Sequence, residues 1–136
     1  SIVANRKAKS LAVIENVQVD YRLEDFFDIN WSDKNYDNVI GICFQFVPHH
    51  LIDNVLMDLR SATKKGGTLL IHGYTPTQLK YGTGGPKDKS LMYTKDTFTN
   101  LFHESEIFKL EEYEAIINEG IGHSGRSAMI DFIAKF

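Results

Sequence analysis

The stretch Val39-Ile40-Gly41-Ile42-Cys43-Phe44 decides the fold class, because its apolar residues would fall on both faces of an extended chain. Strands buried on both faces are typical of parallel sheets, whose faces are covered by helices. A helix is predicted next, from residue 48 to about residue 64, and Gly66-Gly67 is expected to end it. A second buried strand is predicted at residues 68–72. The order of strand, helix and strand indicates an α/β fold with a parallel sheet.

The segments on either side extend this pattern. Upstream, residues 2–12 are predicted to form an amphipathic helix, and residues 17–23 alternate with a period of two, as a strand does. Downstream, Thr94 is predicted to cap a helix that runs to about Phe102. Two further strands are predicted, at residues 107–117 and 128–136, joined by a glycine-containing loop. The predicted sheet is therefore mostly parallel and finishes with a C-terminal antiparallel hairpin.

The composition limits the class of protein. The chain has 136 residues, of which 43% are apolar and 24% charged. That length supports one packed core, so we predict a single domain over residues 1–136. The net charge of -3 argues against a nucleic-acid partner. No apolar run approaches the roughly 20 residues that span a bilayer, so no membrane partner is expected. The single cysteine, Cys43, excludes an internal disulfide and fits a reducing cytoplasm.

A glycine-rich loop follows the second buried strand. The octet Tyr81-Gly82-Thr83-Gly84-Gly85-Pro86-Lys87-Asp88 contains four glycine or proline residues, which forbid a continuous helix or strand. We expect an ordered loop at the mouth of the sheet, where α/β folds bind ligands. The same sequence is compatible with a structural Ω-loop.

Several segments together resemble class I S-adenosylmethionine (SAM)-dependent methyltransferases. They are the acidic segment Leu23-Glu24-Asp25-Phe26, the strand segment at residues 37–43, and residues 59–71. In the last of these, Lys64-Lys65-Gly66-Gly67 stands where the family often has Lys-Pro-Gly-Gly, so Lys65 replaces the usual proline. Within the family, residues 78–87 and 119–125 look most like the small bacterial branch of tellurite-resistance or thiopurine methyltransferase-like proteins.

The resemblance implies a Rossmann-like sheet with the family's strand order 3-2-1-4-5-7-6. The family's first strand and its glycine-rich cofactor loop have no counterpart in this sequence, so we expect the chain to be an N-terminally incomplete, carboxyl-terminal portion of the domain. The predicted strands at residues 17–23 and 39–44 would then lack neighbours. We expect them to pair with each other or with another copy of the chain, as a homodimer.

The resemblance also implies the chemistry, which is transfer of a methyl group from SAM to a small-molecule acceptor. Such a transfer needs alignment and exclusion of water more than a dedicated acid or base, so no catalytic residue is assigned. By their place in the family's fold, Leu23 and Glu24 are expected to lie beside the adenine. Cys43, Phe44 and Gln45 are expected near the methionine part of the cofactor. The residues expected on the acceptor side are Tyr74, Tyr81, Gly84, Gly85 and His123.

Each assignment has a structural alternative. Leu23 and Phe44 also fit core positions at strand ends, and Cys43 fits a small buried residue better than a reactive thiol. His123 fits a solvated turn residue better than an acid or base. No metal site is predicted, because the adjacent pair His49-His50 would point in different directions on a helix. The alternative function is a non-catalytic fragment or interaction module that does not bind the cofactor.

Overall fold

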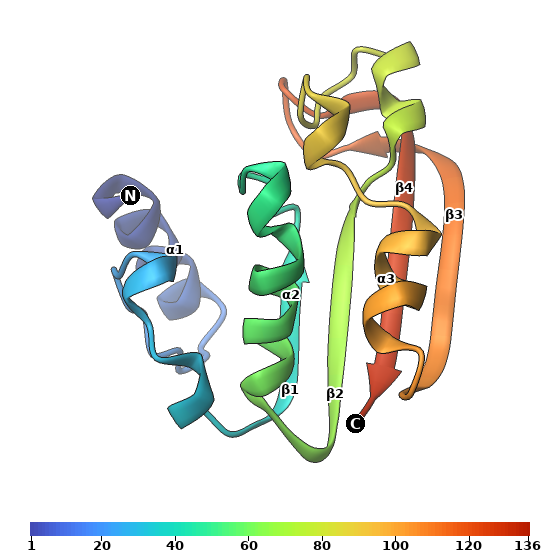
Figure 1. Cartoon of the computed structure of the whole chain (residues 1–136). Coiled ribbons are helices and arrows are strands. Elements are labelled where there is room, and N and C mark those ends of the chain that lie inside the picture. The colour runs from blue at the N-terminus through green and yellow to red at the C-terminus, as the bar shows by residue number, and fades with distance from the viewer. The chain divides into compact units, whose positions relative to one another are not determined.

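The computed structural model describes all 136 residues, and their contacts divide them into two units, Ser1–Asn30 and Trp31–Phe136. Each unit is described by itself. The first contains helix α1, Ile2–Ile14, which confirms the helix predicted there (Figure 1). The side chain of Ser1 caps the start of α1, and Asn16 turns the chain after it with a φ of 52°. The hydroxyl of Tyr21 donates to the carbonyl of Ala8 at 2.9 Å and ties the following segment to the helix.

Residues 17–23 have no regular secondary structure, so the strand predicted there was wrong. The sheet consists of strands β1, β2, β4 and β3 alone, and residues 17–23 form no ladder with any of them. An alternating pattern shows which side chains share a face, but a strand also needs a partner whose backbone groups complete the ladder. The expected direct pairing of this segment with the strand near residue 39 is not observed.

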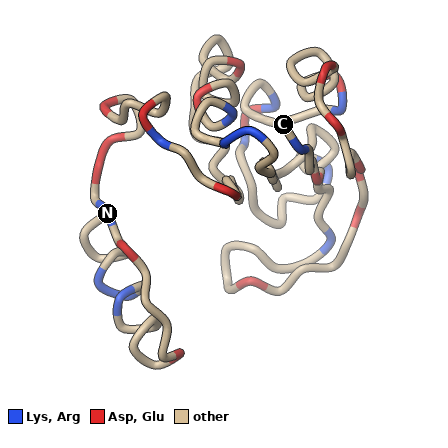
Figure 2. The backbone as a smooth tube through the Cα atoms, turned by 90° about the horizontal axis from the view of Figure 1, so that it is seen from below, with Lys and Arg blue, Asp and Glu red and all other residues tan.

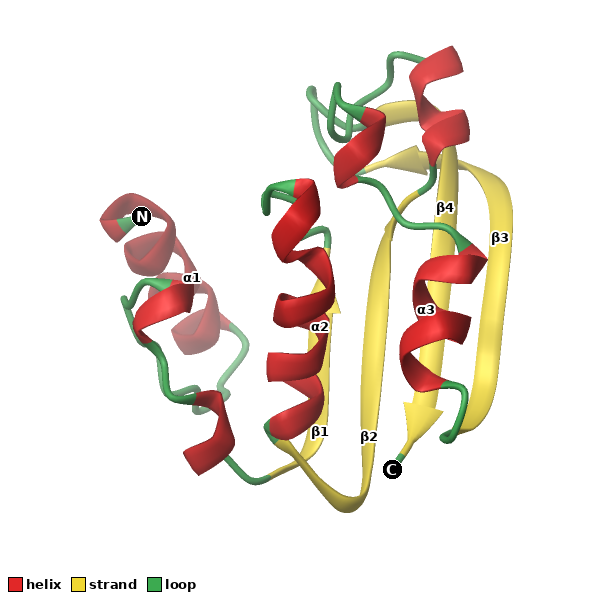
Figure 3. Cartoon of the chain, in the orientation of Figure 1, coloured by secondary structure: helices red, strands yellow, loops and turns green.

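The second unit is a four-stranded sheet in the order β1-β2-β4-β3 (Figure 3). Strand β1, Tyr36–Ile42, pairs in parallel with β2, Thr63–Tyr74, and the crossover between them contains helix α2, Ile52–Ser61. Strand β4, Ser124–Lys135, pairs antiparallel with β2 and with β3, Glu106–Asn118. This arrangement confirms the α/β fold class and the C-terminal hairpin. Its order matches the last four strands, 4-5-7-6, of the order that the resemblance implies.

Helices α2 and α3, Lys95–Phe102, cover the same face of this sheet (Figure 1). The predicted cap at Thr94 is present as a capping box with Thr97. Under α3, the ring of Phe132 on β4 stacks on Phe98, with centroids 4.6 Å apart, and on Phe102 at 5.1 Å. Stacked aromatic pairs contribute about 0.5–1.5 kcal/mol beyond their buried area. The core of the unit therefore lies between the two helices and the sheet.

Strand β2 begins earlier than predicted, at Thr63, so Gly66 and Gly67 lie inside the strand and do not end the helix. The register between β1 and β2 shifts between Tyr36 and Asn38. Gly66 has a φ of 79°, and a Cβ on Gly67 would lie 2.8 Å from a backbone oxygen of β1. The two glycines therefore allow the bulge and the close approach of the strands, which a larger residue would prevent.

A polar cluster lies on the sheet face opposite α2 and α3, because His72 and Asp131 alternate with the buried residues of β2 and β4. Oδ1 of Asp131 lies 2.7 Å from Nδ1 of His72 and accepts from the hydroxyl of Tyr113 at 3.4 Å. Oδ2 accepts from Nζ of Lys109 at 2.6 Å. Burial alone would raise the pKa of Asp131, but the hydrogen bonds from Lys109 and His72 outweigh it and lower that pKa. The cluster joins β2, β3 and β4 across this face.

Charged residues of both signs are interspersed along the chain (Figure 2). One such pair, Lys64 with Asp37, joins β2 to β1. None of the three α-helices has the length and apolar character that a membrane crossing requires.

Candidate functional site

The carboxyl ends of the parallel strands β1 and β2 meet at one edge of the sheet, and the candidate site is built there (Figure 1). The glycine-rich loop follows β2 at this edge, and the turn between β3 and β4 lies at the same end. In open α/β sheets, ligands bind outside the carboxyl ends of parallel strands. The topology therefore brings three distant segments of the chain to the place where a ligand is expected.

A cavity of about 240 Å³ lies at this edge, and we call it the inner cavity. Six residues from several segments line it, and five of them were predicted from the sequence for the cofactor or acceptor side. The sixth is Pro86. The lining residues are Cys43, Gln45, Tyr74, Gly85, Pro86 and His123. The fold thus brings together residues that are up to 80 positions apart in the sequence, from Cys43 to His123.

A second cavity, of about 480 Å³, adjoins the first, and we call it the outer cavity. Gly85, Pro86 and His123 line both cavities, so these three residues form the wall between them. The predicted residue Gly84 lines the outer cavity as well. The other lining residues are Gln78, Leu79, Gly82, Lys87 and Gly122.

Tyr74 and His123 form a polar pair at the wall. The hydroxyl of Tyr74 lies 3.0 Å from Nδ1 of His123, and the two rings stack at 6.3 Å between centroids. Burial raises the pKa of Tyr74, and negative charge on Cys43 and Glu119 would raise it further. The phenol therefore keeps its proton at neutral pH and can donate it to Nδ1. In that arrangement the imidazole proton is on Nε2.

The glycines of the loop let its backbone approach this pair. Gly84 and Gly85 have φ values of 127° and 78°, in the region that favours glycine. A Cβ on Gly84 would lie 2.6 Å from Nδ1 of His123, and one on Gly85 would lie 2.9 Å from the ring of Tyr74. The loop backbone is therefore in direct contact with both side chains, which is why neither position has room for a side chain.

Cys43 lies just after β1, and its amide donates to the carbonyl of His72 at 2.9 Å, which extends the pairing with β2 by one residue. Its φ of 51° is in the left-handed region. The residue is exposed, so the interpretation as a small buried core residue was wrong. Partial burial raises the pKa of its thiol, and the charge of Glu119 raises it further. The thiol is therefore protonated at neutral pH and is a poor nucleophile there.

The side chain of Gln45 is used within the protein. The amide N–H of Tyr74 donates to Oε1 of Gln45 at 2.6 Å, and Nε2 donates to the carbonyls of Tyr74 at 2.9 Å and Leu91 at 3.2 Å. Gln45 is buried, with 8% of its surface exposed. Its hydrogen bonds connect the end of β2 to the segment before α3. Gln45 therefore fixes the backbone around the inner cavity, which it also lines.

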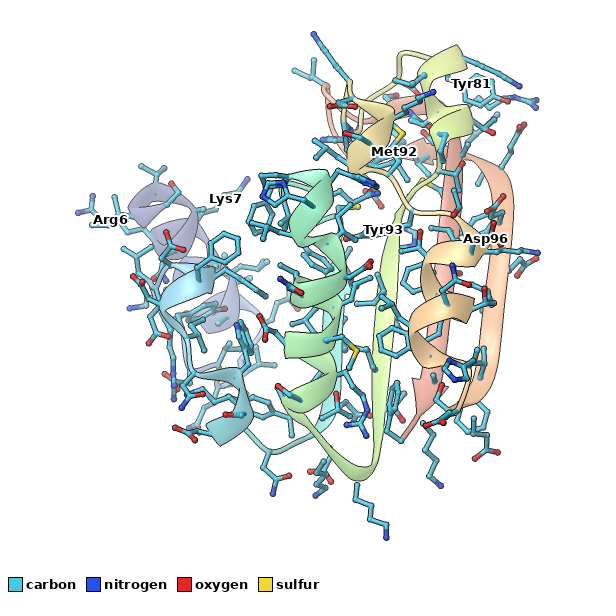
Figure 4. All side chains as sticks on the ribbon, viewed as in Figure 1. Arg6, Lys7, Tyr81, Met92, Tyr93 and Asp96 are labelled. Carbon is cyan, nitrogen blue, oxygen red and sulfur yellow. The ribbon has the colours of Figure 1, made fainter.

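The other predicted residues lie outside the two cavities. Phe44 is half-buried, and its ring lies 6.3 Å from that of Tyr93 between centroids. Tyr93 precedes α3 (Figure 4). Tyr81 lies on the outer side of this end of the unit (Figure 4), where a hydrogen bond to Glu114 raises its pKa. Leu23 and Glu24 are exposed residues of the first unit.

Sequence reasoning missed Gln78, Thr83 and Pro86 at this site. Gln78 is buried, with 1% of its surface exposed, and it hydrogen-bonds to the loop and to β4. A glutamine gives no sequence signal for burial, because its residue type is mostly exposed in proteins. No three His, Cys, Asp or Glu side chains of the structure lie together in a way that could hold a metal ion.

No family model matches the chain, and no curated protein matches it in sequence. Solved structures do match. TehB from Haemophilus influenzae has a TM-score of 0.68 at 16% identity over 93% of this chain. A SAM-dependent methyltransferase from Methanosarcina mazei has a TM-score of 0.62 at 14% identity over 87% of this chain, and one from Anabaena variabilis has 0.62 at 15% over 94%.

This chain spans 44% of the length of the TehB chain, 67% of the Methanosarcina protein and 63% of the Anabaena protein. At these identities the matches establish the fold. The chain has a Rossmann-like α/β fold that it shares with SAM-dependent methyltransferases, which confirms at the level of fold the resemblance seen in the sequence.

Proposed function

We propose that this chain is part of an enzyme that transfers a methyl group from SAM to a small-molecule acceptor. The observation that carries the proposal is the inner cavity, which lies at the carboxyl edge of β1 and β2 and is lined by residues from both predicted groups. The fold shared with SAM-dependent methyltransferases supports it. On this proposal, Cys43 and the end of β1 face the methyl donor, and Tyr74, Gly85 and His123 form the acceptor wall.

The residues around the inner cavity fit a positively charged ligand group. SAM, when bound, supplies an electrophilic methyl group on a sulfonium cation. Burial is the main cause of the raised pKa of Cys43 and of Tyr74, and the charge of Glu119 raises both further, so the negative charge of Glu119 acts on these two lining residues. Tyr74 adds an aromatic ring, which attracts cations, and no Lys or Arg lines this cavity. Leu23 and Glu24, for which the resemblance implies a place beside the adenine, belong to the first unit.

The size of the inner cavity favours a small acceptor. Its volume of about 240 Å³ is below the roughly 300–1,000 Å³ of pockets that hold drug-sized ligands. Tellurite, thiols, thiopurine-like heterocycles and other small metabolites all belong to the proposed acceptor class. Gln45 supports this side of the cavity by fixing the backbone of Tyr74.

The Tyr74 and His123 pair gives a neutral acceptor a route for its proton. An acceptor that attacks through an O–H, S–H or N–H group loses that proton when the new bond to carbon forms. The hydroxyl oxygen of Tyr74 takes the proton and passes its own to Nδ1 of His123, 3.0 Å away, which leaves an imidazolium ion. No charge is left on the phenol, whose raised pKa makes a phenolate unfavourable.

Calorimetric titration tests the proposal. S-adenosylhomocysteine, the demethylated product, is expected to bind with micromolar affinity, which corresponds to about −8 kcal/mol. Glu119→Gln should weaken the binding of SAM more than that of S-adenosylhomocysteine, because only SAM carries the sulfonium charge. Glu104→Gln, whose side chain is 91% exposed, is the matched control and should change neither affinity. The absence of any heat at millimolar ligand would contradict the proposal and favour the non-catalytic module.

A further inference from the structure

Gln78 lines the outer cavity and lies in the 3₁₀ helix Pro76–Lys80 that follows β2. It is one of the most buried polar residues of the chain, with 1% of its surface exposed. We infer that Gln78 is a positioning residue, which fixes the glycine-rich loop against Tyr74 and His123 and so holds that pair in its hydrogen-bonded geometry. Which ligand this pair would contact depends on the proposed function, whereas the positioning of the pair by Gln78 does not.

The amide of Gln78 joins the loop to the sheet. On the loop side, Nε2 donates to Oγ1 of Thr83 and to the carbonyl of Gly84, both at 3.0 Å. On the sheet side, the amide N–H of Ala128 in β4 donates to Oε1 at 2.8 Å. Both halves of the amide are therefore engaged. A buried amide with three partners is costly to disturb, since each partner would be left without a hydrogen bond where water does not replace it.

Thr83 forms the second link between the loop and β4. Its hydroxyl accepts from Gln78 and donates to the carbonyl of Arg126 at 2.6 Å, so one oxygen connects the amide to the strand. Its Cγ2 also packs on Gly125, where a Cβ would lie only 2.7 Å away. The two links hold the loop at Thr83 and at Gly84.

The loop needs these links because its backbone is intrinsically permissive. Gly82, Gly84 and Gly85 all have positive φ, and glycine adopts several other conformations at little cost. The positions of Gly84 and Gly85 in turn define the contact with His123 and Tyr74. Without Gln78, the segment that separates the inner and outer cavities would lose its main anchor, and the hydrogen bond between Tyr74 and His123 would lose the backbone that confines it.

The tautomer of His123 provides a direct test. Imidazole ¹⁵N chemical shifts report which ring nitrogen carries the proton, and the His123 signals are assigned by comparison with His123→Gln. In the wild-type protein we expect the Nε2–H form, with Nδ1 accepting from the hydroxyl of Tyr74 3.0 Å away. In Gln78→Met, which has a similar shape but lacks the amide, we expect a mixture of both tautomers. Hydrogen exchange of the loop amides at residues 82–85 should also accelerate by about tenfold or more.

Two variants separate this role from a general loss of stability. Thr63→Val removes a buried hydroxyl that donates to the carbonyl of Leu59, at the opposite end of β2. It should lower the unfolding free energy and leave the His123 tautomer unchanged. Thr83→Ser keeps the hydroxyl and should keep the wild-type tautomer, whereas Thr83→Val should shift it. A wild-type tautomer and wild-type loop exchange in Gln78→Met would overturn the inference.

If Gln78→Met does not fold, Thr83→Val decides the question by the same two measurements, and a wild-type result there would equally overturn the inference. Neither measurement needs a ligand. An unchanged His123 tautomer in the variant, together with binding of S-adenosylhomocysteine by the wild-type protein, would refute the positioning role alone. A shifted tautomer in the variant, with no binding by the wild-type protein, would refute the proposed function alone.

Discussion

The side-chain amide of Gln45 binds both backbone groups of Tyr74. The N–H of Tyr74 donates to Oε1 at 2.6 Å, and Nε2 donates to the carbonyl of the same residue at 2.9 Å. A side chain thus pairs with the backbone of a residue 29 positions away, in the way that a neighbouring strand would. Tyr74 is the last residue of β2 and lines the inner cavity. Its carbonyl also accepts from the amide of Tyr93 at 3.1 Å, so Gln45 and Tyr93 together fix its backbone.

Replacing this amide should destabilise the protein measurably. In Gln45→Leu, the buried N–H and C=O of Tyr74 and the carbonyl of Leu91 lose a partner, and we expect the unfolding free energy to fall by about 2–3 kcal/mol. Urea denaturation measures the change. Gln18→Leu, at an exposed position, is the control and should stay within about 0.5 kcal/mol of the wild type. Equal stability of the two variants would show that the contact contributes nothing.

Gly85 should be far less tolerant of alanine than Gly82. Both have positive φ, which costs a residue with a Cβ about 1–2 kcal/mol. At Gly82 nothing lies within 4 Å of the added Cβ, whereas at Gly85 it would lie 2.9 Å from the ring of Tyr74. Gly85→Ala should therefore cost more in thermal unfolding than Gly82→Ala and should displace the tyrosine ring in NMR spectra. Similar losses for both would mean that only the φ angle matters.

The alkylation of Cys43 should depend on Glu119. The pKa of the thiol is raised above its usual 9.0, first by burial and then by the charge of Glu119, so the thiolate fraction near neutral pH is small. In the native wild-type protein the rate with iodoacetamide should keep rising with pH beyond that value. Glu119→Gln should react faster at pH 8, as followed by mass spectrometry. Glu104→Gln is the control, and a rate for Glu119→Gln no higher than that of this control would contradict the charge effect.

Asp131 should make stability depend on pH in acid. Its pKa is lowered in the folded state, so its contribution is fully present above the unfolded value of about 3.9 and is lost as the pH falls through the folded pKa. Asp131→Asn should cost about 1.5–3 kcal/mol at pH 7, because hydrogen bonds to charged groups contribute that much. The difference between variant and wild type, measured by denaturation at several pH values, should shrink below about pH 4. A difference that does not change with pH would rule out the carboxylate as its source.

Local signals in the sequence were sufficient for much of the fold. The alternation of apolar residues in β4 and the cap at Thr94 depend on neighbours within a few positions, and both are present in the structure. The strand expected at residues 17–23 and the start of β2 were wrong for a different reason. Ladder formation and the bulge at Gly66 and Gly67 depend on which backbone lies alongside, and a single segment does not contain that information.

The residues of the candidate site likewise include some that could be predicted from the sequence and some that could not. Cys43, Tyr74, Gly85 and His123 could be predicted to lie together, because parallel strands end at one edge and the loops that follow them gather there. Gln78 could not, because its partner Ala128 is 50 residues away and a glutamine in a turn looks like a surface residue. Buried amides of this kind are recognised only once their partners are known.

The left-handed backbone at Cys43 has a consequence for variation at this position. A φ of 51° costs a residue with a side chain about 1–2 kcal/mol, and glycine would avoid that cost. Stability by itself would thus favour glycine at the end of β1, yet glycine would remove the only sulfur atom that lines the inner cavity. An unstrained backbone and a side chain in the cavity are therefore not both available at this residue. Replacing Cys43 by glycine would relieve the backbone and remove the side chain.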